Sequence, residues 1–88
     1  MTEQTITIVN RAGIHARPAA MVVQLTKNYS CNIYFEKGKD RINAKSIMGI
    51  ITLGASYGTE LKIIADGNDE EIAVKTLVRL FESKFEEE

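Results

Sequence analysis

The stretch NIYFEKGKDRIN, residues 32–43, contains two short strand-like runs on either side of a glycine. The runs are Asn32 to Lys37 and Asp40 to Asn43, and Lys37-Gly38-Lys39 separates them. A glycine between two such runs is typical of a tight β-hairpin, so we expect the two strands to pair antiparallel. The fold is therefore expected to form around an antiparallel sheet.

Before this hairpin, the sequence predicts a strand and then a helix. Thr5 to Val9 alternates polar and β-branched apolar residues, and Asn10 to Gly13 interrupts the pattern. A helix is expected from Ala16 to about Asn28, with Pro18 in its first turn, where a missing N–H costs nothing, and His15 at its cap. Apolar or small residues recur in it at helical spacing: Ala19, Val22, Val23 and Thr26.

After the hairpin, Ser46 precedes the apolar segment Ile47 to Leu53, which Gly54 follows. A hydroxyl before such a segment and a glycine after it favour a short helix with an N-cap and a C-cap. The β-branched residues in this segment would also suit a strand.

The last third of the chain predicts one more strand and one more helix. Thr59 to Ala65 alternates, with Lys62 and Ile64 facing away from the other apolar side chains. Asn68 and Glu71 resemble a capping box, which predicts the start of the final helix. Its apolar stripe is formed by Val74, Leu77, Val78, Phe81 and Phe85.

The expected order is β-α-β-β-α-β-α within one domain that covers residues 1–88. This order favours an α+β open-faced β-sandwich, a four-stranded antiparallel sheet with three helices on one face. The uncovered face is expected to carry Thr5, Thr7, Tyr34 and Lys62.

Composition excludes several classes of protein. The chain has 11 Lys and Arg against 12 Asp and Glu, so its formal charge of −1 gives no reason to expect binding to nucleic acid. Cys31 is the single cysteine and cannot form an internal disulfide, which favours a reducing cytoplasm. We expect no membrane insertion, no metal site and no cofactor, and Glu86 to Glu88 are expected to form a solvated tail.

His15 is the single histidine and the candidate reactive group. A neutral imidazole is nucleophilic, and the N–H groups at a helix start would stabilise a phosphoryl group bound there. Arg17 adds a cation in the first turn. From these residues alone, His15 could instead be a surface or capping histidine, and Arg17 a solvated residue.

Ser46 has a structural role as an N-cap, and the same position would favour a phosphate through the helix dipole. Ile47, Met48, Ile50 and Ile51 cannot all face the core from a helix of two turns, so we expect an exposed docking patch. The alternative is a buried strand without a patch.

Two motifs at this separation closely resemble the histidine-containing phosphocarrier family HPr: Gly13-Ile14-His15-Ala16-Arg17-Pro18-Ala19 and Asn43-Ala44-Lys45-Ser46-Ile47-Met48-Gly49. The resemblance covers the whole chain. It implies a carrier of the phosphoenolpyruvate-dependent sugar phosphotransferase system, a covalent shuttle more than an enzyme acting alone. It also implies that the chain accepts a phosphoryl group from enzyme I and passes it to enzyme IIA domains. A monomer is the simplest state for such a relay, because its active surface must meet successive partners.

The same resemblance assigns roles to individual residues. His15 matches the phosphoacceptor, which reacts at Nδ1, and Arg17 matches the arginine that binds the phosphate. Ser46 matches the serine that an ATP-dependent HPr kinase/phosphorylase modifies in the Gram-positive type, whose serine-phosphorylated form is a corepressor for a catabolite control transcription factor. The expected partner-binding residues are Ala16, Ala20, Ile47, Met48 and Ile51.

One position departs from the family pattern. Many relatives have Ser, Thr or Asn where this chain has Ala12, so a hydrogen bond from that side chain to the loop around His15 is not expected. The regulatory paralogues of the family lack the histidine, and His15 argues against membership of that group.

Overall fold

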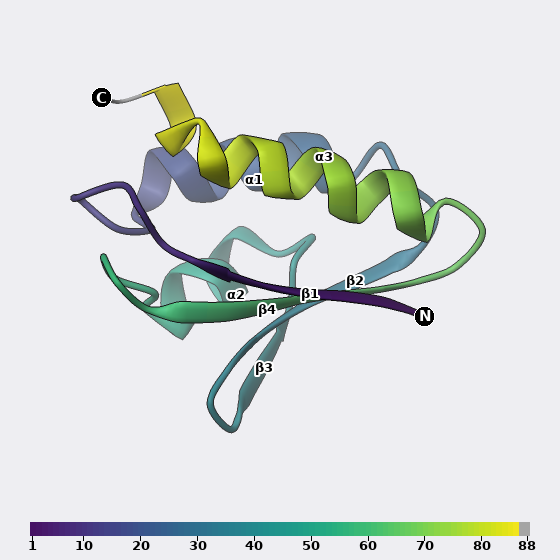
Figure 1. Cartoon of the computed structure of the whole chain (residues 1–88), viewed down its shortest axis with the longest axis horizontal. Helices are drawn as coiled ribbons and strands as arrows, with labels where there is room; N and C mark the ends of the chain where they lie inside the picture. The colour runs from purple at the N-terminus through teal and green to yellow at the C-terminus, as the bar shows by residue number, and fades with distance from the viewer. Residues whose placement is uncertain (87–88) are drawn as a thin grey trace.

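The computed structural model describes residues 1–86. The helices and strands along the chain are β1 (Thr2–Thr7), α1 (Ala16–Thr26), β2 (Asn32–Lys37), β3 (Asp40–Asn43), α2 (Ile47–Leu53), β4 (Glu60–Asp66), α3 (Glu70–Glu82) and the 3-10 turn η1 (Lys84–Glu86). The four strands form one antiparallel sheet in the order β1-β4-β2-β3. Figure 1 shows α1 and α3 lying side by side across one face of this sheet, and the other face is uncovered. The predicted open-faced α+β sandwich is confirmed.

The hairpin of β2 and β3 has the predicted bounds. Phe35 lies opposite Ile42, and Lys37 lies opposite Asp40. Gly38 begins the two-residue turn with a φ of 59°, a left-handed conformation that a residue without Cβ adopts at little cost. A local signal therefore determined both the turn and the register.

The middle of the sheet is β4, which pairs with β1 on one side and with β2 on the other. Three of its side chains face the helices and are almost fully buried: Leu61, Ile63 and Ala65. On the uncovered face, Lys62 lies between Thr5 and Glu36 in the register, and Ile64 lies between Glu3 and Tyr34. The prediction for this face is confirmed, although Ile64 is only 2% exposed because neighbouring side chains cover it.

The core lies between the sheet and the helices, and aromatic rings contribute a large part of it. Phe81 packs edge-on against Phe35 and Phe85, with ring centroids 5.8 and 5.0 Å away. Such T-shaped contacts are favourable because the positive edge of one ring meets the negative face of the next. All five residues of the predicted apolar stripe are buried, but Phe85 lies beyond the end of α3, in η1: Val74, Leu77, Val78, Phe81 and Phe85.

Several predicted boundaries differ from the structure. The first strand was expected over Thr5 to Val9 but spans Thr2–Thr7, because β4 offers hydrogen-bonding partners as far as Thr2. The last strand runs from Glu60 to Asp66 instead of Thr59 to Ala65, and α1 ends at Thr26, before Asn28.

The predicted capping box of Asn68 and Glu71 is wrong. The N-cap of α3 is Asp69, whose side chain makes no capping hydrogen bond. It accepts hydrogen bonds from the backbone amides of Ser30 and Cys31, at 2.8 and 2.9 Å. A tertiary contact with the segment before β2 has taken the place of the local cap.

Of the three glutamates expected to form a solvated tail, only Glu86 lies within the described residues. Glu86 belongs to η1, and Glu87 and Glu88 lie outside the described residues. Within residues 1–86, no helix is both long enough and apolar enough to cross a membrane.

Candidate functional site

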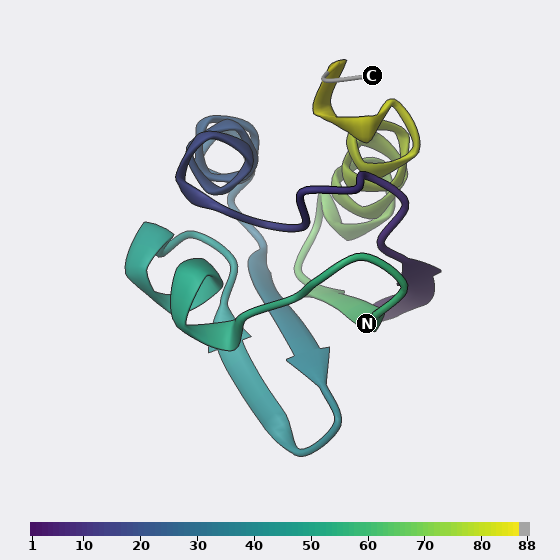
Figure 2. The ribbon, with the colours of Figure 1, turned by 90° about the vertical axis from the view of Figure 1, so that its left-hand side faces the viewer.

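The loop between β1 and α1 is held by the backbone of the segment between α2 and β4. Ile8 exchanges two hydrogen bonds with this segment, donating to Thr59 O at 2.9 Å and accepting from Gly58 N at 2.8 Å. Ile14 N donates to Ala55 O at 2.9 Å. Figure 2 shows the two segments running past each other at one end of the molecule, beside the first turn of α1.

Gly13 is required in this loop for two reasons. Its φ of 71° is a backbone conformation that residues with a Cβ rarely adopt, and a Cβ there would lie 3.0 Å from both Ala55 O and Ser56 Cα. The close approach of the two segments therefore depends on a glycine at this position. It brings Ile14, and with it His15, to a defined place at the start of α1.

His15 is the N-cap of α1, with extended backbone angles (φ −113°, ψ −165°). Its carbonyl accepts the first helical hydrogen bond, from Ala19 N at 3.0 Å, and its side chain is exposed and makes no capping hydrogen bond to the helix. No acidic residue lies in the first turn. The imidazole therefore lies at the positive end of a helix, without a carboxylate in that turn to repel an anion.

Arg17, in the first turn of α1, contacts the C-terminal turn. Its Nη2 donates to Phe85 O at 3.1 Å, and its Nη1 lies 3.3 Å from Met21 Sδ. Lys84 and Phe85 both have left-handed backbone angles, with φ of 57° and 55°. This strained turn buries the Phe85 ring completely while its carbonyl faces Arg17. Arg17 and His15 thus both lie at the start of α1, with the Arg17 guanidinium held by the C-terminal turn.

Ser46 is the N-cap of α2, as predicted, and its Oγ accepts a hydrogen bond from Gly49 N at 3.0 Å. A Cβ on Gly49 would lie 3.3 Å from that oxygen, so the glycine leaves room for the cap. The neighbouring Lys45 donates from its Nζ to Tyr29 O at 2.6 Å.

An exposed apolar patch is present on α2, as predicted. Ile47, Met48 and Ile51 are 41, 69 and 38% exposed, while Ile50 is buried at 2%. The alternative of a buried strand is wrong. We call the three exposed side chains the α2 patch. On α1, Ala16 is exposed and Ala20 is half-buried.

Contacts at both ends hold α1 and α2 together. The end of α1 meets the start of α2, where Thr26 Oγ1 donates to Ala44 O at 2.9 Å. The start of α1 meets the end of α2 through the bond between Ile14 and Ala55. His15 and Ser46 therefore lie at opposite ends of this helix pair, and α1 between them is about 16 Å long at 1.5 Å per residue.

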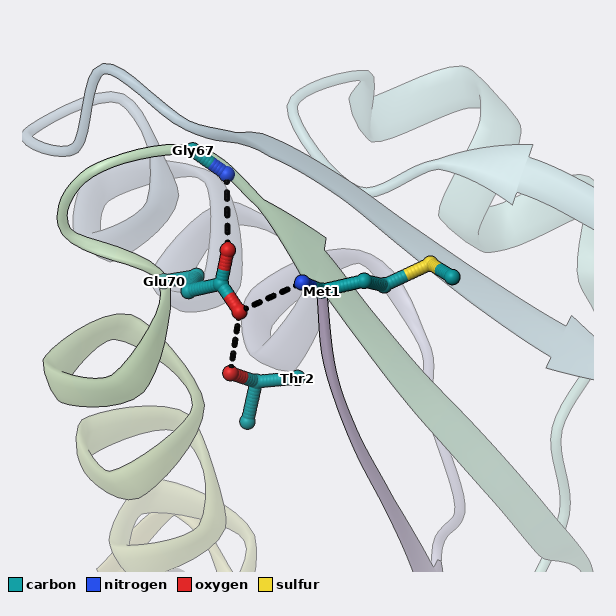
Figure 3. A network of polar contacts seen from close by, with 4 residues as sticks. All are labelled: Met1, Thr2, Gly67 and Glu70. Carbon is teal, nitrogen blue, oxygen red and sulfur yellow. Dashed lines mark hydrogen bonds and ion pairs between the residues drawn. The ribbon is translucent and has the colours of Figure 1, made fainter.

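The carboxylates with strongly lowered pKa values lie away from this loop, at the start of α3. Figure 3 shows the Glu70 carboxylate accepting from Thr2 Oγ1 at 2.5 Å and from Gly67 N at 3.1 Å, with the Met1 ammonium 2.9 Å away. These three contacts, with the Thr2 hydroxyl foremost, lower the pKa of Glu70 to about 2. The pKa of Asp69 is lowered to about 2 as well, chiefly by the Ser30 amide.

Cys31 is a buried free thiol. Burial first, and then the Asp69 carboxylate, raises its pKa to about 11, so the reactive thiolate is disfavoured. Within residues 1–86 no group of three or more His, Cys, Asp or Glu side chains could hold a metal ion.

Residues 2–83 of the chain match the protein family described as PTS HPr component phosphorylation site. The chain belongs to the HPr family. The phosphocarrier protein HPr of Treponema pallidum is 44% identical over 88 residues, which are all of both chains. The family model and the HPr relative together support a role for this chain as a phosphocarrier of the phosphotransferase system.

Solved structures of the HPr family agree with the fold. HPr from Thermoanaerobacter tengcongensis is 55% identical, with a TM-score of 0.96 over 100% of this chain and 99% of that one. Crh, the catabolite repression containing protein of Bacillus subtilis, is 37% identical, with a TM-score of 0.77 over 94% of this chain and 95% of that one. The crystal structure of Crh is of a dimer with a swapping domain.

The sequence analysis missed one residue of the loop. The sequence pattern identifies Asn10 only as the start of the break after the first strand, yet it is 1% exposed and its Nδ2 donates to Gly13 O at 2.6 Å. An asparagine three residues before a glycine is a recognised turn signal and could have identified it. Ala12, in contrast, is exposed.

Proposed function

We propose that this HPr-family chain accepts a phosphoryl group from phosphorylated enzyme I on His15 and passes it to enzyme IIA domains for sugar uptake. The observation that carries the proposal is the position of His15. It is an exposed imidazole at the N-cap of α1 that makes no capping bond to the helix, in the motif that the family shares. The exposed side chain lies where a large protein donor can approach it, and the helix start favours the anion that results.

The transfer is a substitution at phosphorus. The lone pair of His15 Nδ1 forms the new P–N bond, while the bond between phosphorus and the donor group of enzyme I breaks and the donor keeps its electron pair. The reverse substitution then passes the group to an enzyme IIA domain. The protein contributes position and charge to both steps and needs no cofactor.

Arg17 is proposed to stabilise the phosphoryl group through its guanidinium. It lies two residues after His15, and its Nη2 bond to Phe85 O holds it beside the start of α1. A planar guanidinium donates from several N–H groups, so one can stay on the carbonyl while others meet phosphate oxygens.

Incubation with phosphoenolpyruvate and enzyme I tests the proposal. We expect one acid-labile phosphoryl group per chain, because a P–N bond hydrolyses in acid whereas a phosphoserine does not. No label in the wild-type protein, or label that persists in His15→Ala, would contradict it.

A second, regulatory function is proposed at Ser46, which an HPr kinase/phosphorylase would modify with ATP. The Ser46 oxygen would form a bond to the γ-phosphorus and lose its proton, and ADP would leave. The Ser46-Ile47-Met48 motif and the α2 patch beside it support this proposal, as does the similarity to Crh, a catabolite repression protein. The modified chain would act as a corepressor with a catabolite control transcription factor. This regulatory role is the alternative to sugar transport as the main function of the protein.

Kinase and ATP distinguish the two functions. If Ser46 carries regulation, wild-type protein gains an acid-stable phosphate that Ser46→Ala does not gain, and Ser46→Asp binds the transcription factor differently from wild type. Failure of both results would leave the carrier function alone.

The docking surface proposed for these partners consists of Ala16 and Ala20 with the α2 patch. Because successive partners need this surface, we propose that the protein is a monomer. We also propose that it is cytoplasmic and forms one domain over residues 1–88. Light scattering after gel filtration tests the monomer against a dimer like that of Crh. A mass of twice 9.8 kDa would contradict it.

A further inference from the structure

Residues 1–86 contain two buried side chains that are polar or charged, Asn10 and Thr26, at 1% and 0% exposure. Thr26 joins the end of α1 to Ala44, a contact between two packed elements. Asn10 instead bonds within its own turn, five residues before His15. A polar group is costly to bury, so its hydrogen bonds indicate what the position is needed for.

Asn10 fixes the backbone on both sides of Gly13. The Asn10 carbonyl accepts from Gly13 N at 3.1 Å, and Asn10 Nδ2 donates to Gly13 O at 2.6 Å. One residue therefore holds the peptide unit that enters Gly13 and the one that leaves it.

The second of these peptide units joins Gly13 to Ile14, and it is held from two directions. Its carbonyl accepts from the Asn10 side chain, and its N–H donates to Ala55 O at 2.9 Å. The Ile14 side chain is buried, at 8% exposure. Only the peptide unit between Ile14 and His15 follows it, so the orientation of the held unit sets the direction in which the chain enters His15 and the first turn of α1.

Gly13 makes this control necessary. A glycine rotates about φ and ψ with little steric resistance, so the plane between Gly13 and Ile14 can turn if only one of its two polar atoms is held. Ala12 has no polar side chain that could hold the loop in place of Asn10.

We propose that Asn10 is a positioning residue for His15. By holding the Gly13 carbonyl it sets the direction of the imidazole, and it thereby determines which ring nitrogen faces an incoming phosphoryl donor. The proposal rests on the proposed function of His15 as the phosphoacceptor.

Asn10→Leu tests it, because leucine has a similar volume and no hydrogen-bond donor. Thr26→Val is the matched control, since it removes the other buried bond between a side chain and a backbone carbonyl, outside the loop. Phosphorylated enzyme I is the donor, at a temperature where both variants are folded. We expect the rate of transfer to Asn10→Leu to be about tenfold lower or more, which corresponds to a rise of RT ln 10 in the activation free energy. The rate of transfer to Thr26→Val should stay within about twofold of the wild-type rate, which is a small change in the activation free energy.

A chemical donor gives a readout that needs no partner protein. Phosphoramidate transfers its phosphoryl group to a histidine nitrogen with release of ammonia, and ³¹P NMR separates the Nδ1 from the Nε2 product. The ratio of the two products should change in Asn10→Leu and stay unchanged in Thr26→Val. If Asn10→Leu does not fold, Asn10→Ala replaces it in both experiments.

The outcomes are distinguishable. Wild-type transfer rates and product ratios in a folded Asn10 variant would overturn the inference and leave the proposed function intact. Equal losses in the Asn10 and Thr26 variants would overturn it too, because the effect would then be one of stability. No transfer from enzyme I to the wild-type protein would refute the proposed function instead, while the phosphoramidate products would still test the orientation of His15.

Discussion

The two ends of the sandwich are held together in different ways. At the start of α3, to the right in Figure 1, two carboxylates with pKa values lowered to about 2 connect α3 to Thr2 and to Ser30. At the start of α1, backbone hydrogen bonds and the Asn10 amide hold the loop. The first turn of the helix that His15 caps contains no acidic residue. The comparison indicates that two carboxylates connect α3 to its neighbours, whereas backbone and amide hydrogen bonds set the course of the loop before His15.

The largest effect is expected from His15→Ala. The side chain is exposed and makes no capping bond, so the free energy of unfolding should change by no more than about 0.5 kcal/mol. Transfer from enzyme I should be lost entirely. Urea unfolding and acid-labile labelling measure the two quantities, and a large loss of stability would show that the imidazole has a structural role at this end.

Gly13→Ala should damage the same end through its backbone. The left-handed φ and the 3.0 Å approach to Ala55 O and Ser56 Cα should together cost about 3 kcal/mol or more, and transfer should slow as the loop moves. Gly38→Ala is the control, since its φ is 59° but nothing lies near its Cβ, and we expect about 1–2 kcal/mol there and unchanged transfer. Equal losses of stability in the two variants would mean that the contact with Ala55 and Ser56 contributes nothing.

Glu70→Gln tests the ionic end through its pH dependence. The pKa of Glu70 is about 2 in the folded protein against an ordinary 4.5, so the carboxylate stabilises the fold fully above about pH 4.5, and this contribution is lost as the pH falls toward 2. Wild-type stability should therefore decrease more steeply than that of Glu70→Gln between pH 5 and pH 2, with the two curves converging in acid. Glu71→Gln, one residue further along the exposed first turn, should keep the wild-type slope. Parallel curves for wild type and Glu70→Gln would remove the distinction between the two ends.

The smallest effect on the fold is expected from Met48→Ser in the α2 patch. Met48 is 69% exposed, so stability should stay within about 0.5 kcal/mol of wild type. Binding to an enzyme IIA domain, measured by calorimetry, should weaken about tenfold if the side chain is a central apolar contact. Ile72→Ser, at a 53% exposed position on α3, should leave binding unchanged. The reverse pattern would place docking on the helix face that carries Ile72.

Elements with strong local signals were predicted to the residue. The hairpin of β2 and β3 has a glycine turn between alternating strands, and α2 has a serine cap and a glycine stop, so a few neighbouring residues determine each. The places of His15 and Arg17 at the start of α1 were predicted for the same reason, since both belong to one local pattern. Predictions for β1 and for the cap of α3 failed because partners distant in sequence, β4 and Ser30, decide them.

By itself the sequence determined the order of the elements, the faces that α1 and α3 bury, and the presence of His15 and Ser46 at two helix starts. Apolar periodicity, turns and caps depend on residues a few positions apart, and the sequence contains them directly. Only the tertiary structure decided that Ala55 O would hold the N–H of Ile14, that Phe85 O would hold Arg17, and that His15 and Ser46 would lie at opposite ends of a helix pair. These contacts join segments up to 68 residues apart, and a hydrogen bond depends on distance and angle in space, which local pattern does not specify.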